Sequence, residues 1–383
     1  MSLERRLLTR LAELDAAGLR RRLPPIAHRR GTRYELDGHA VVGFCSNDYL
    51  GFAVDEATHV IPNGASASRL VSGDLPAHRA LERALAAYVD TEDCVLFPSG
   101  FQLNVGVLPS LLEGDDVAYS DALNHASLID GLRLARATVE RLPHGTPPPP
   151  DASSAPGLVW WVCESLYSMD GDFSDPDAMR TALEQGHHLY VDEAHALGLY
   201  PHGAGLLQSH DLRPTVLVGT LGKAFGASGA FAAASATVCH WIRTRARSFV
   251  YSTGPSPALV STIAGILPRI TGAEGDDRRA RLWRNVERFS TNLGITRRPP
   301  SPIVPFVVGS NERALECAAA LLQAGFHVQA IRPPTVPDGT ARLRLTLSAL
   351  HTFDEIDALC DAMSTVFHDA GIEPSPSIPR PAR

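Results

Sequence analysis

The feature that most constrains the fold of this chain is an alternation of short apolar runs and helical segments between about Ser46 and Ala273. The apolar runs have the length of strands. They are Cys94–Phe97, Val117–Ser120, Leu158–Val162, Leu189–Asp192, Val216–Thr220 and Ala230–Ala234. Helical patterns occur at Ala77–Val89, Asn104–Leu112, Leu128–Ala135 and Asp177–Gln185. The alternation predicts an α/β fold in which helices cover both faces of a mostly parallel sheet.

The remaining sequence predicts two smaller parts. Residues 1–45 hold an amphipathic helix, Met1–Leu19, and a hairpin that turns at Asp37-Gly38. A Gly- and Asp-rich break at Thr271–Asp277 separates a large domain, 46–273, from a C-terminal α+β domain, 278–383. We expect a strand at Ala341–Leu347, a loop at Gly145–Gly157 and a disordered tail at Pro374–Arg383.

Composition excludes several classes of protein. The net charge of −7 argues against a general nucleic-acid binder, which is usually basic. Six scattered cysteines without a C-x-x-C pair favour free thiols in a reducing cytoplasm. The sequence shows neither the apolar core of a signal peptide nor an 18-residue apolar run. We therefore expect a cytoplasmic protein with neither nucleic-acid nor membrane partners.

The chemistry is concentrated where predicted strands end. Asp192 closes one apolar run, and Lys223 follows another within Thr220–Gly226. A lysine on a glycine-flanked loop can form a Schiff base, and a carboxylate at a strand end can keep a pyridine nitrogen protonated. Pyridoxal 5′-phosphate (PLP) needs both groups. The pair therefore predicts a PLP site.

Other side chains fall at the same predicted sheet edge, where ligands of open α/β sheets bind. Ser99-Gly100-Phe101 opens a helix whose N-terminus can hold a phosphate, and the ring of His125 can stack on a flat cofactor. Ser168, His195 and Thr220 complete the set. Each has a purely structural interpretation, such as a helix N-cap for an aspartate, but their concurrence favours a site.

Other chemistries fit less well. Asp192-Glu193-Ala194-His195 has the letters of a helicase DEAH box, but the sequence has no P-loop to accompany it. The histidines at 187, 188 and 195 do not have zinc-ligand spacing, so we expect no metal. The Gly226–Gly229 segment is one residue too short for a serine-hydrolase elbow.

Five long motifs resemble those of the α-oxoamine synthases, fold-type I PLP enzymes that condense an amino acid with an acyl thioester. The likeness extends from about Arg20 to about Phe367. The motifs are Phe44–Gly51, Ser68–Gly73, Asp121–Gly131, Asp192–His195 and Gly219–Gly226.

The resemblance implies a role for each matching residue. Lys223 would form the Schiff base and move protons, Asp192 would pair with the ring nitrogen, and His195 would bind the phenolic oxygen. His125 would stack on the ring and also contact substrate. Further cofactor contacts would come from Gly100, Phe101, Ser168, Thr220 and, from a second subunit, Thr253. Substrate contacts would come from Arg20, Asn47, Thr335 and Arg344.

The resemblance also implies a homodimer with shared active sites and, as substrates, an amino acid and an acyl-CoA or acyl carrier protein. The expected pair is L-alanine and a pimeloyl thioester, used in biotin synthesis. Glycine-using 2-amino-3-ketobutyrate ligases and 5-aminolevulinate synthases, or a non-catalytic PLP-binding relative, are the alternatives. Departures from the family pattern at 64–78 and 147–167 affect the expected substrate more than the cofactor.

Overall fold

The computed structural model describes residues 12–19, 26–52, 64–150, 152, 156–295 and 301–372. These residues form two compact units, each built from segments distant in sequence. The larger unit contains residues 50–168 and 172–279, and the smaller unit contains the described residues before Leu50, residues 169–171 and those from Ala280 onward. Expectations for Arg20 and for Pro374–Arg383 concern residues outside the described ranges.

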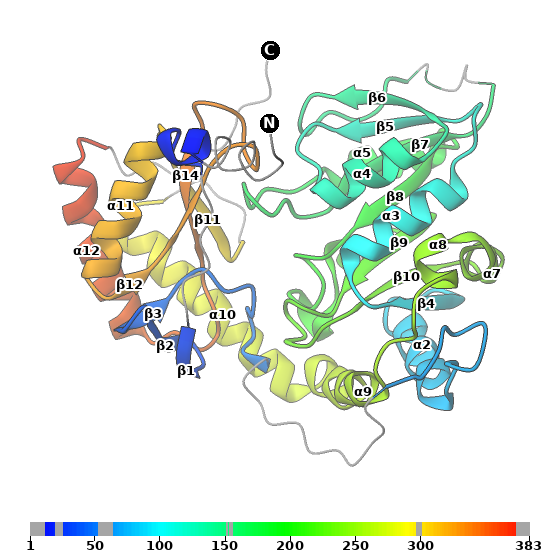
Figure 1. Ribbon diagram of the computed structural model, residues 1–383, viewed down its shortest axis with the longest axis horizontal. Helices are drawn as coiled ribbons and strands as arrows, with labels where there is room; N and C mark the ends of the chain where they lie inside the picture. Colours follow the sequence, from blue (N-terminus) through cyan, green and yellow to red (C-terminus); the bar gives the residue numbers. More distant parts are fainter. Residues whose placement is uncertain are drawn as a thin grey trace. The chain divides into compact units, whose positions relative to one another are not determined.

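The larger unit is built on a seven-stranded sheet in the order β4-β10-β9-β8-β7-β5-β6 (Figure 1). Only β10 runs antiparallel to its neighbours, so the predicted mostly parallel sheet is confirmed. The strands are β4 (Asp93–Phe97), β5 (Val117–Asp121), β6 (Thr138–Leu142), β7 (Val159–Glu164), β8 (His188–Asp192), β9 (Val216–Thr220) and β10 (Ala230–Ala234).

Helices cover this sheet because each has an apolar face to bury. They are α2 (Pro76–Tyr88), α3 (Gly100–Leu111), α4 (Ala126–Leu134), α5 (Pro176–Glu184), the short η3 (Pro201–Gly203) and α6 (Leu206–Ser209), α7 (Ala236–Arg245), α8 (Arg247–Val250) and α9 (Pro257–Thr271). One side of the core is filled by residues of α3, α4 and α7 packed on β4, β5 and β7–β10, including Leu103, Val107 and Leu128.

Two helices begin earlier than the hydrophobic pattern predicts. The predicted start of α3 was Asn104, but the side chain of Ser99 accepts a hydrogen bond from the Gln102 N–H (3.2 Å) and caps the helix one residue before Gly100. The side chain of His125 caps α4 in the same way, through the Ser127 N–H (3.2 Å). Both caps place a helix N-terminus directly after a strand of the sheet.

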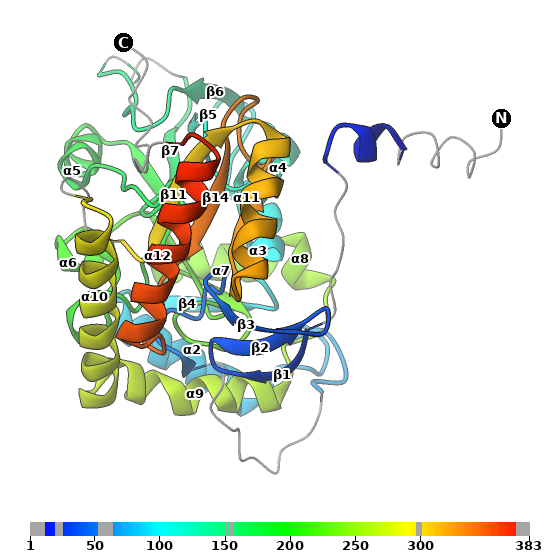
Figure 2. The ribbon, with the colours of Figure 1, turned by 90° about the vertical axis from the view of Figure 1, so that its left-hand side faces the viewer.

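The smaller unit holds two smaller sheets with the orders β1-β2-β3-β12 and β11-β14-β13. The strands are β1 (Ile26–Arg30), β2 (Arg33–Leu36), β3 (His39–Gly43), β11 (Ile303–Gly309), β12 (Phe326–His327), β13 (Gln329–Ile331) and β14 (Ala341–Thr346). The helices α11 (Asn311–Gln323) and α12 (Phe353–Asp369) lie side by side (Figure 2), and α11 packs on β11 and β14.

The hairpin predicted at Asp37-Gly38 is present, and both turn residues have positive φ (52° and 83°), as a tight two-residue turn requires. The break expected at Thr271–Asp277 is narrower than predicted. Only Gly272 separates α9 from α10 (Ala273–Asn292). A side chain at Gly275 would overlap the Ile270 carbonyl, so glycine permits this tight join. Helix α10 then continues from the larger unit into the smaller one.

Candidate active site

Four parallel strands of the larger unit bring acidic and hydroxyl side chains to one edge of the sheet. Asp121 closes β5, Glu164 closes β7, Asp192 closes β8 and Thr220 closes β9. Glu164 and Asp192 are direct neighbours in the register of β7 and β8, and Asp192 pairs with Val218 of β9. The carboxyl ends of parallel strands are where ligands bind in such sheets.

Asp192 is buried, with 5% of its surface exposed. Its Oδ1 accepts a hydrogen bond from the Ala194 N–H (2.9 Å), and its Oδ2 accepts one from Asn104 Nδ2 (3.0 Å). Donors on both oxygens stabilise the ionised carboxylate in a buried place. Asp192 can therefore present a fixed negative charge to a protonated ring nitrogen.

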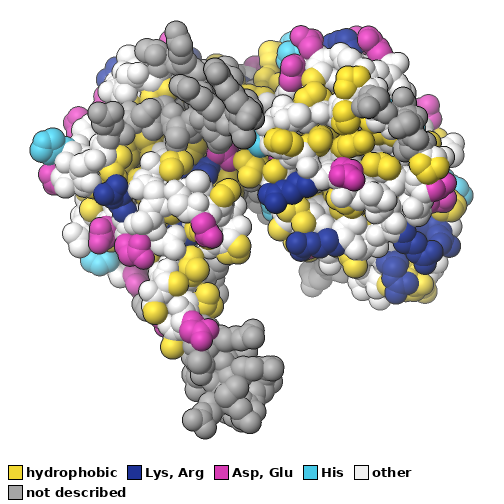
Figure 3. Space-filling view, turned by 90° about the horizontal axis from the view of Figure 1, so that it is seen from above, with side chains coloured by type: hydrophobic (Ala, Val, Ile, Leu, Met, Phe, Trp, Pro, Cys, Tyr) yellow, Lys and Arg dark blue, Asp and Glu magenta, His cyan; other side chains and the backbone are white. Residues whose placement is uncertain are grey.

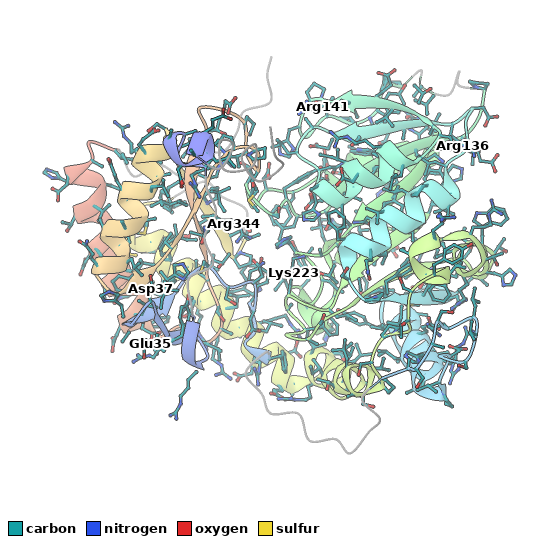
Figure 4. The ribbon with its side chains drawn as sticks, viewed as in Figure 1. Glu35, Asp37, Arg136, Arg141, Lys223 and Arg344 are labelled. Atoms are coloured by element: carbon teal, nitrogen blue, oxygen red, sulfur yellow. The ribbon has the colours of Figure 1, made fainter. Side chains whose placement is uncertain are left out.

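Lys223 lies in the loop after β9 (Figure 4), and its Nζ donates to Thr220 Oγ1 (3.3 Å). The loop is held by backbone hydrogen bonds from Leu221 to Gly229 (2.9 Å) and from Gly226 to Lys223 (2.8 Å). Both glycines have positive φ (63° and 102°), a conformation that side chains oppose. Lys223 is also the only lysine in the sequence, so it carries the only side-chain amine of the chain.

His125 is bound at its backbone and at its ring. Its N–H donates to Glu164 Oε1 (2.6 Å), and its Nδ1 lies 2.7 Å from Ser127 Oγ. Burial lowers the pKa of His125, with Asp192 acting to raise it and Lys223 to lower it. The imidazole is therefore neutral near pH 7, and the charges of Asp192 and Lys223 both act on it.

Glu164 was not anticipated from the sequence. Burial, followed by the nearby charge of Asp192, raises the pKa of Glu164 to about 8. A protonated Glu164 adds no second negative charge beside Asp192. The sequence did contain a signal for Glu164, because an acidic residue ends the otherwise apolar strand Val159–Glu164, which is buried throughout.

The N-terminus of α3 is suited to holding an anion. In the first turn of a helix the N–H groups have no intrahelical acceptor, and the helix dipole favours negative charge there. A Cβ at Gly100 would lie only 2.8 Å from Thr220 Cγ2, so glycine allows α3 and β9 to approach closely. The ring of Phe101 meets that of His125 edge-on, with centroids 6.4 Å apart.

The other predicted cofactor residues of the larger unit are His195, Ser168 and Thr253. His195 and Ser168 are buried. Thr253 is exposed and forms an isolated β-bridge with Ser68, and the Gly254 N–H donates to the Ala67 carbonyl (3.0 Å). Thr253 is thus tied to the 64–73 loop.

Besides His125 in the larger unit, the described residues predicted to bind substrate are Asn47, Thr335 and Arg344, and these belong to the smaller unit. Arg344 lies on β14, is 5% exposed, and donates from Nη2 to Asn47 Oδ1 (3.2 Å). Tyr49 is close to the same guanidinium. Burial raises the pKa of the Tyr49 hydroxyl to about 12, while the charge of Arg344 acts to lower it. Thr335 is exposed. Arg344 and Asn47 are therefore brought together, and the Thr335 N–H donates to the Arg332 carbonyl (3.1 Å).

Proteins of known family resemble this chain over nearly its whole length. A profile described as aminotransferase class I and II matches residues 39–363. The 8-amino-7-oxononanoate synthase of Herminiimonas arsenicoxydans is 39% identical over 93% of this chain and 98% of its own length. The synthase of the same name from Anaeromyxobacter dehalogenans is 41% identical over 94% of both chains. The chain belongs to the α-oxoamine synthases within the class I and II aminotransferase family.

A solved structure also shares the fold of this chain. A solved structure of serine palmitoyltransferase from S. paucimobilis superposes with a TM-score of 0.86, at 24% identity, over 97% of this chain and 100% of that one. This likeness concerns the fold. It agrees with the predicted fold-type I architecture of the α-oxoamine synthases.

As an α-oxoamine synthase, the chain is a PLP-dependent transferase. The residues described fit that cofactor. A buried carboxylate, a neutral imidazole, a single lysine and a helix N-terminus are respectively suited to a ring nitrogen, a ring face, an aldehyde and a phosphate. Among the described residues, no helix is long and apolar enough to cross a membrane.

Proposed function

We propose that this α-oxoamine synthase condenses L-alanine with a pimeloyl thioester and releases 8-amino-7-oxononanoate, CO₂ and the free thiol, a step of biotin biosynthesis. The observation that carries the proposal is the 39–41% identity to proteins named 8-amino-7-oxononanoate synthase over nearly the whole chain. The thioester is carried by CoA or by an acyl carrier protein.

The residues of the larger unit bind and orient the cofactor in this proposal. Lys223 is the covalent anchor, Asp192 holds the proton on the ring nitrogen, and His125 stacks on the ring. His195 donates to the phenolic oxygen. The phosphate is bound by Thr220 and the N-terminus of α3, with Gly100, Phe101 and Ser168 as further contacts.

When bound, PLP supplies an electron sink for the negative charge that develops at Cα of the amino acid. The protein must then move protons and hold the substrate. Lys223 removes the proton from Cα before the new C–C bond forms, and it returns a proton after CO₂ leaves. Arg344, with Asn47 beside it, binds the amino-acid carboxylate through its planar guanidinium. Thr335 and Arg20 contact the acyl substrate.

We also propose a homodimer in which Thr253 of one chain completes the phosphate site of the other. The residues around Thr253 support the proposed homodimer. Thr253 is bridged to the 64–73 loop, on which Leu70 and Val71 are 56% and 79% exposed, and Tyr251 is 73% exposed. Apolar side chains this exposed are typical of a surface that a partner covers. Figure 3 shows apolar side chains, in yellow, on one face of the larger unit.

We place the enzyme in the cytoplasm, since none of its six cysteines, all of them described, forms a disulfide, as is usual in a reducing compartment.

Substrate preference tests the proposed reaction. Purified enzyme with PLP should turn over L-alanine with a pimeloyl thioester at a higher kcat/KM than glycine or L-serine, and a pimeloyl thioester should outperform acetyl and succinyl thioesters. Product mass and released thiol report each pair. A higher kcat/KM for glycine with a short acyl-CoA would transfer the enzyme to another branch of the family. A protein that binds PLP and turns over none of the pairs would favour the non-catalytic alternative.

A further inference from the structure

Asn104 connects two residues of the candidate site, although no role has been assigned to it. It lies in α3 and is fully buried. Its Nδ2 donates to Asp192 Oδ2 (3.0 Å) and to Ser127 Oγ (2.9 Å), and its Oδ1 accepts from the Tyr190 hydroxyl (2.8 Å). All the hydrogen-bonding capacity of the amide nitrogen is used.

The chemistry of the partners fixes the direction of these hydrogen bonds. An ionised carboxylate can only accept, so the amide nitrogen of Asn104 must face Asp192. Its second hydrogen then points to Ser127, whose own hydroxyl hydrogen is left for His125 Nδ1, 2.7 Å away. The Ser127 N–H also donates to Nδ1 (3.2 Å). With two donors directed at Nδ1, the imidazole carries its proton on Nε2.

We propose that Asn104 is a positioning residue that sets the protonation of two cofactor-holding side chains at once. It stabilises the ionised carboxylate of Asp192, and through Ser127 it stabilises the neutral Nε2–H form of His125. The inference rests on the proposed roles of Asp192 and His125, which it extends to the hydrogen-bond chain behind them.

Both effects favour a protonated, cationic cofactor ring. Without the buried donor of Asn104, the ionised carboxylate of Asp192 loses a hydrogen bond that stabilises it, and it pairs less well with a protonated ring nitrogen. A protonated imidazole would repel a cationic ring, whereas a neutral one can stack on it. The direction of the pKa of His125, lowered chiefly by burial, agrees with a neutral ring.

A simpler role for Asn104 would be to satisfy buried groups in the helix–sheet core. That role predicts a loss of stability alone. The positioning role predicts, in addition, changed protonation at two particular nitrogens. Nitrogen chemical shifts separate the two roles, because they report protonation and not stability.

The test uses three variants of the full chain. Asn104→Leu removes the whole amide, and Ser127→Ala removes only the connection to His125. Asn285→Leu is the matched control, because Asn285 is also buried and makes two Nδ2 hydrogen bonds, to the Ser348 and His351 carbonyls in the smaller unit (both 2.9 Å). Asn104→Ser replaces Asn104→Leu if the latter fails to fold.

The measurements are ¹⁵N NMR of labelled histidine and of PLP labelled at its ring nitrogen, together with the Kd for PLP. We expect Asn104→Leu to shift both nitrogen signals and to weaken PLP binding about tenfold. Ser127→Ala should shift only the His125 signal, and Asn285→Leu should shift neither. Unchanged shifts at both nitrogens in a folded Asn104 variant would overturn the inference.

The experiment also separates this inference from the proposed function. A wild-type protein that fails to bind PLP would contradict the proposed function. The His125 signal of the cofactor-free protein would still test the connection through Ser127, because that hydrogen-bond chain belongs to the protein alone.

Discussion

A lysine side chain can anchor an aldehyde cofactor only where its amine is available and held in place. Lys223 meets the second condition through its bond to Thr220 and the glycine-ordered loop that carries it. Because it is the only lysine, the chain offers a single side-chain amine for covalent attachment. This makes attachment of the cofactor unusually easy to assign.

Borohydride reduction of the PLP-loaded protein should therefore add one cofactor mass per chain, and the label should lie in the peptide that contains Lys223. Lys223→Ala should lose this adduct and the visible absorbance, and its turnover should fall by several orders of magnitude, because both the anchor and the proton carrier are gone. Intact-mass spectrometry and absorbance check the result. A full-yield adduct in Lys223→Ala would place attachment at the N-terminal amine instead.

The sequence was sufficient to predict Lys223, Asp192 and His125 as candidate site residues, since each lies at or just after the end of a recognisable strand. It was not sufficient to find Asn104 or Glu164. Asn104 reaches Asp192 across 88 positions of sequence, and nothing in the local pattern of α3 reveals which side of the helix faces the sheet edge. Their roles depend on burial and on partners that only the fold supplies.

The helices α3 and α4 position part of the site, because α3 carries Asn104 and His125 caps the N-terminus of α4. They pack closely at Gly131, where a Cβ would lie 2.6 Å from the Asn104 carbonyl oxygen and 2.9 Å from Leu108 Cδ1. Backbone atoms cannot move aside as a flexible side chain can. The two helices can therefore approach this closely only because residue 131 is a glycine, which has no side chain.

Gly131→Ala should push α4 away from α3, lower the free energy of unfolding by about 1–3 kcal/mol, and weaken PLP binding by displacing His125. Gly265→Ala is the matched control, since Gly265 also lies within a helix but has no atom within 4 Å of an added Cβ. That control should gain about 0.5–1 kcal/mol from helix propensity. Chemical denaturation and PLP titration measure both variants, and equal stability for the two would contradict the close-packing argument.

At the scale of elements, most strands of the larger unit could be predicted because they are short apolar runs with clear ends. The strands of the smaller unit were harder to predict from the sequence. Strand β12 has only two residues and pairs with β3 through Phe326 and Val42, a contact between segments nearly three hundred residues apart. Such pairing leaves no local periodicity, so the sequence predicted the β2–β3 hairpin of this sheet but not β12.

At the scale of the whole molecule, the main question is whether one chain is sufficient for activity. The isolated chain leaves Thr253, Val71 and Tyr251 exposed on neighbouring segments, although we propose that Thr253 binds the cofactor phosphate of a second subunit. If sites are shared, two inactive chains can complement each other. Lys223→Ala would remove the anchor from one chain, and Thr253→Glu would place a negative charge beside the phosphate bound by the other.

Co-refolding these two variants in equal amounts should then restore activity. Half of the random dimers are mixed, and each mixed dimer has one intact site of two, so the mixture should reach about a quarter of wild-type activity. Each variant alone, and a chain with both substitutions mixed with Lys223→Ala, should stay inactive, because no intact site can form. Activity equal to the sum of the separate variants would show that each site is built from one chain. Sedimentation measured on the same samples establishes whether mixed dimers are present, so a failure to assemble is distinguished from a site that is not shared.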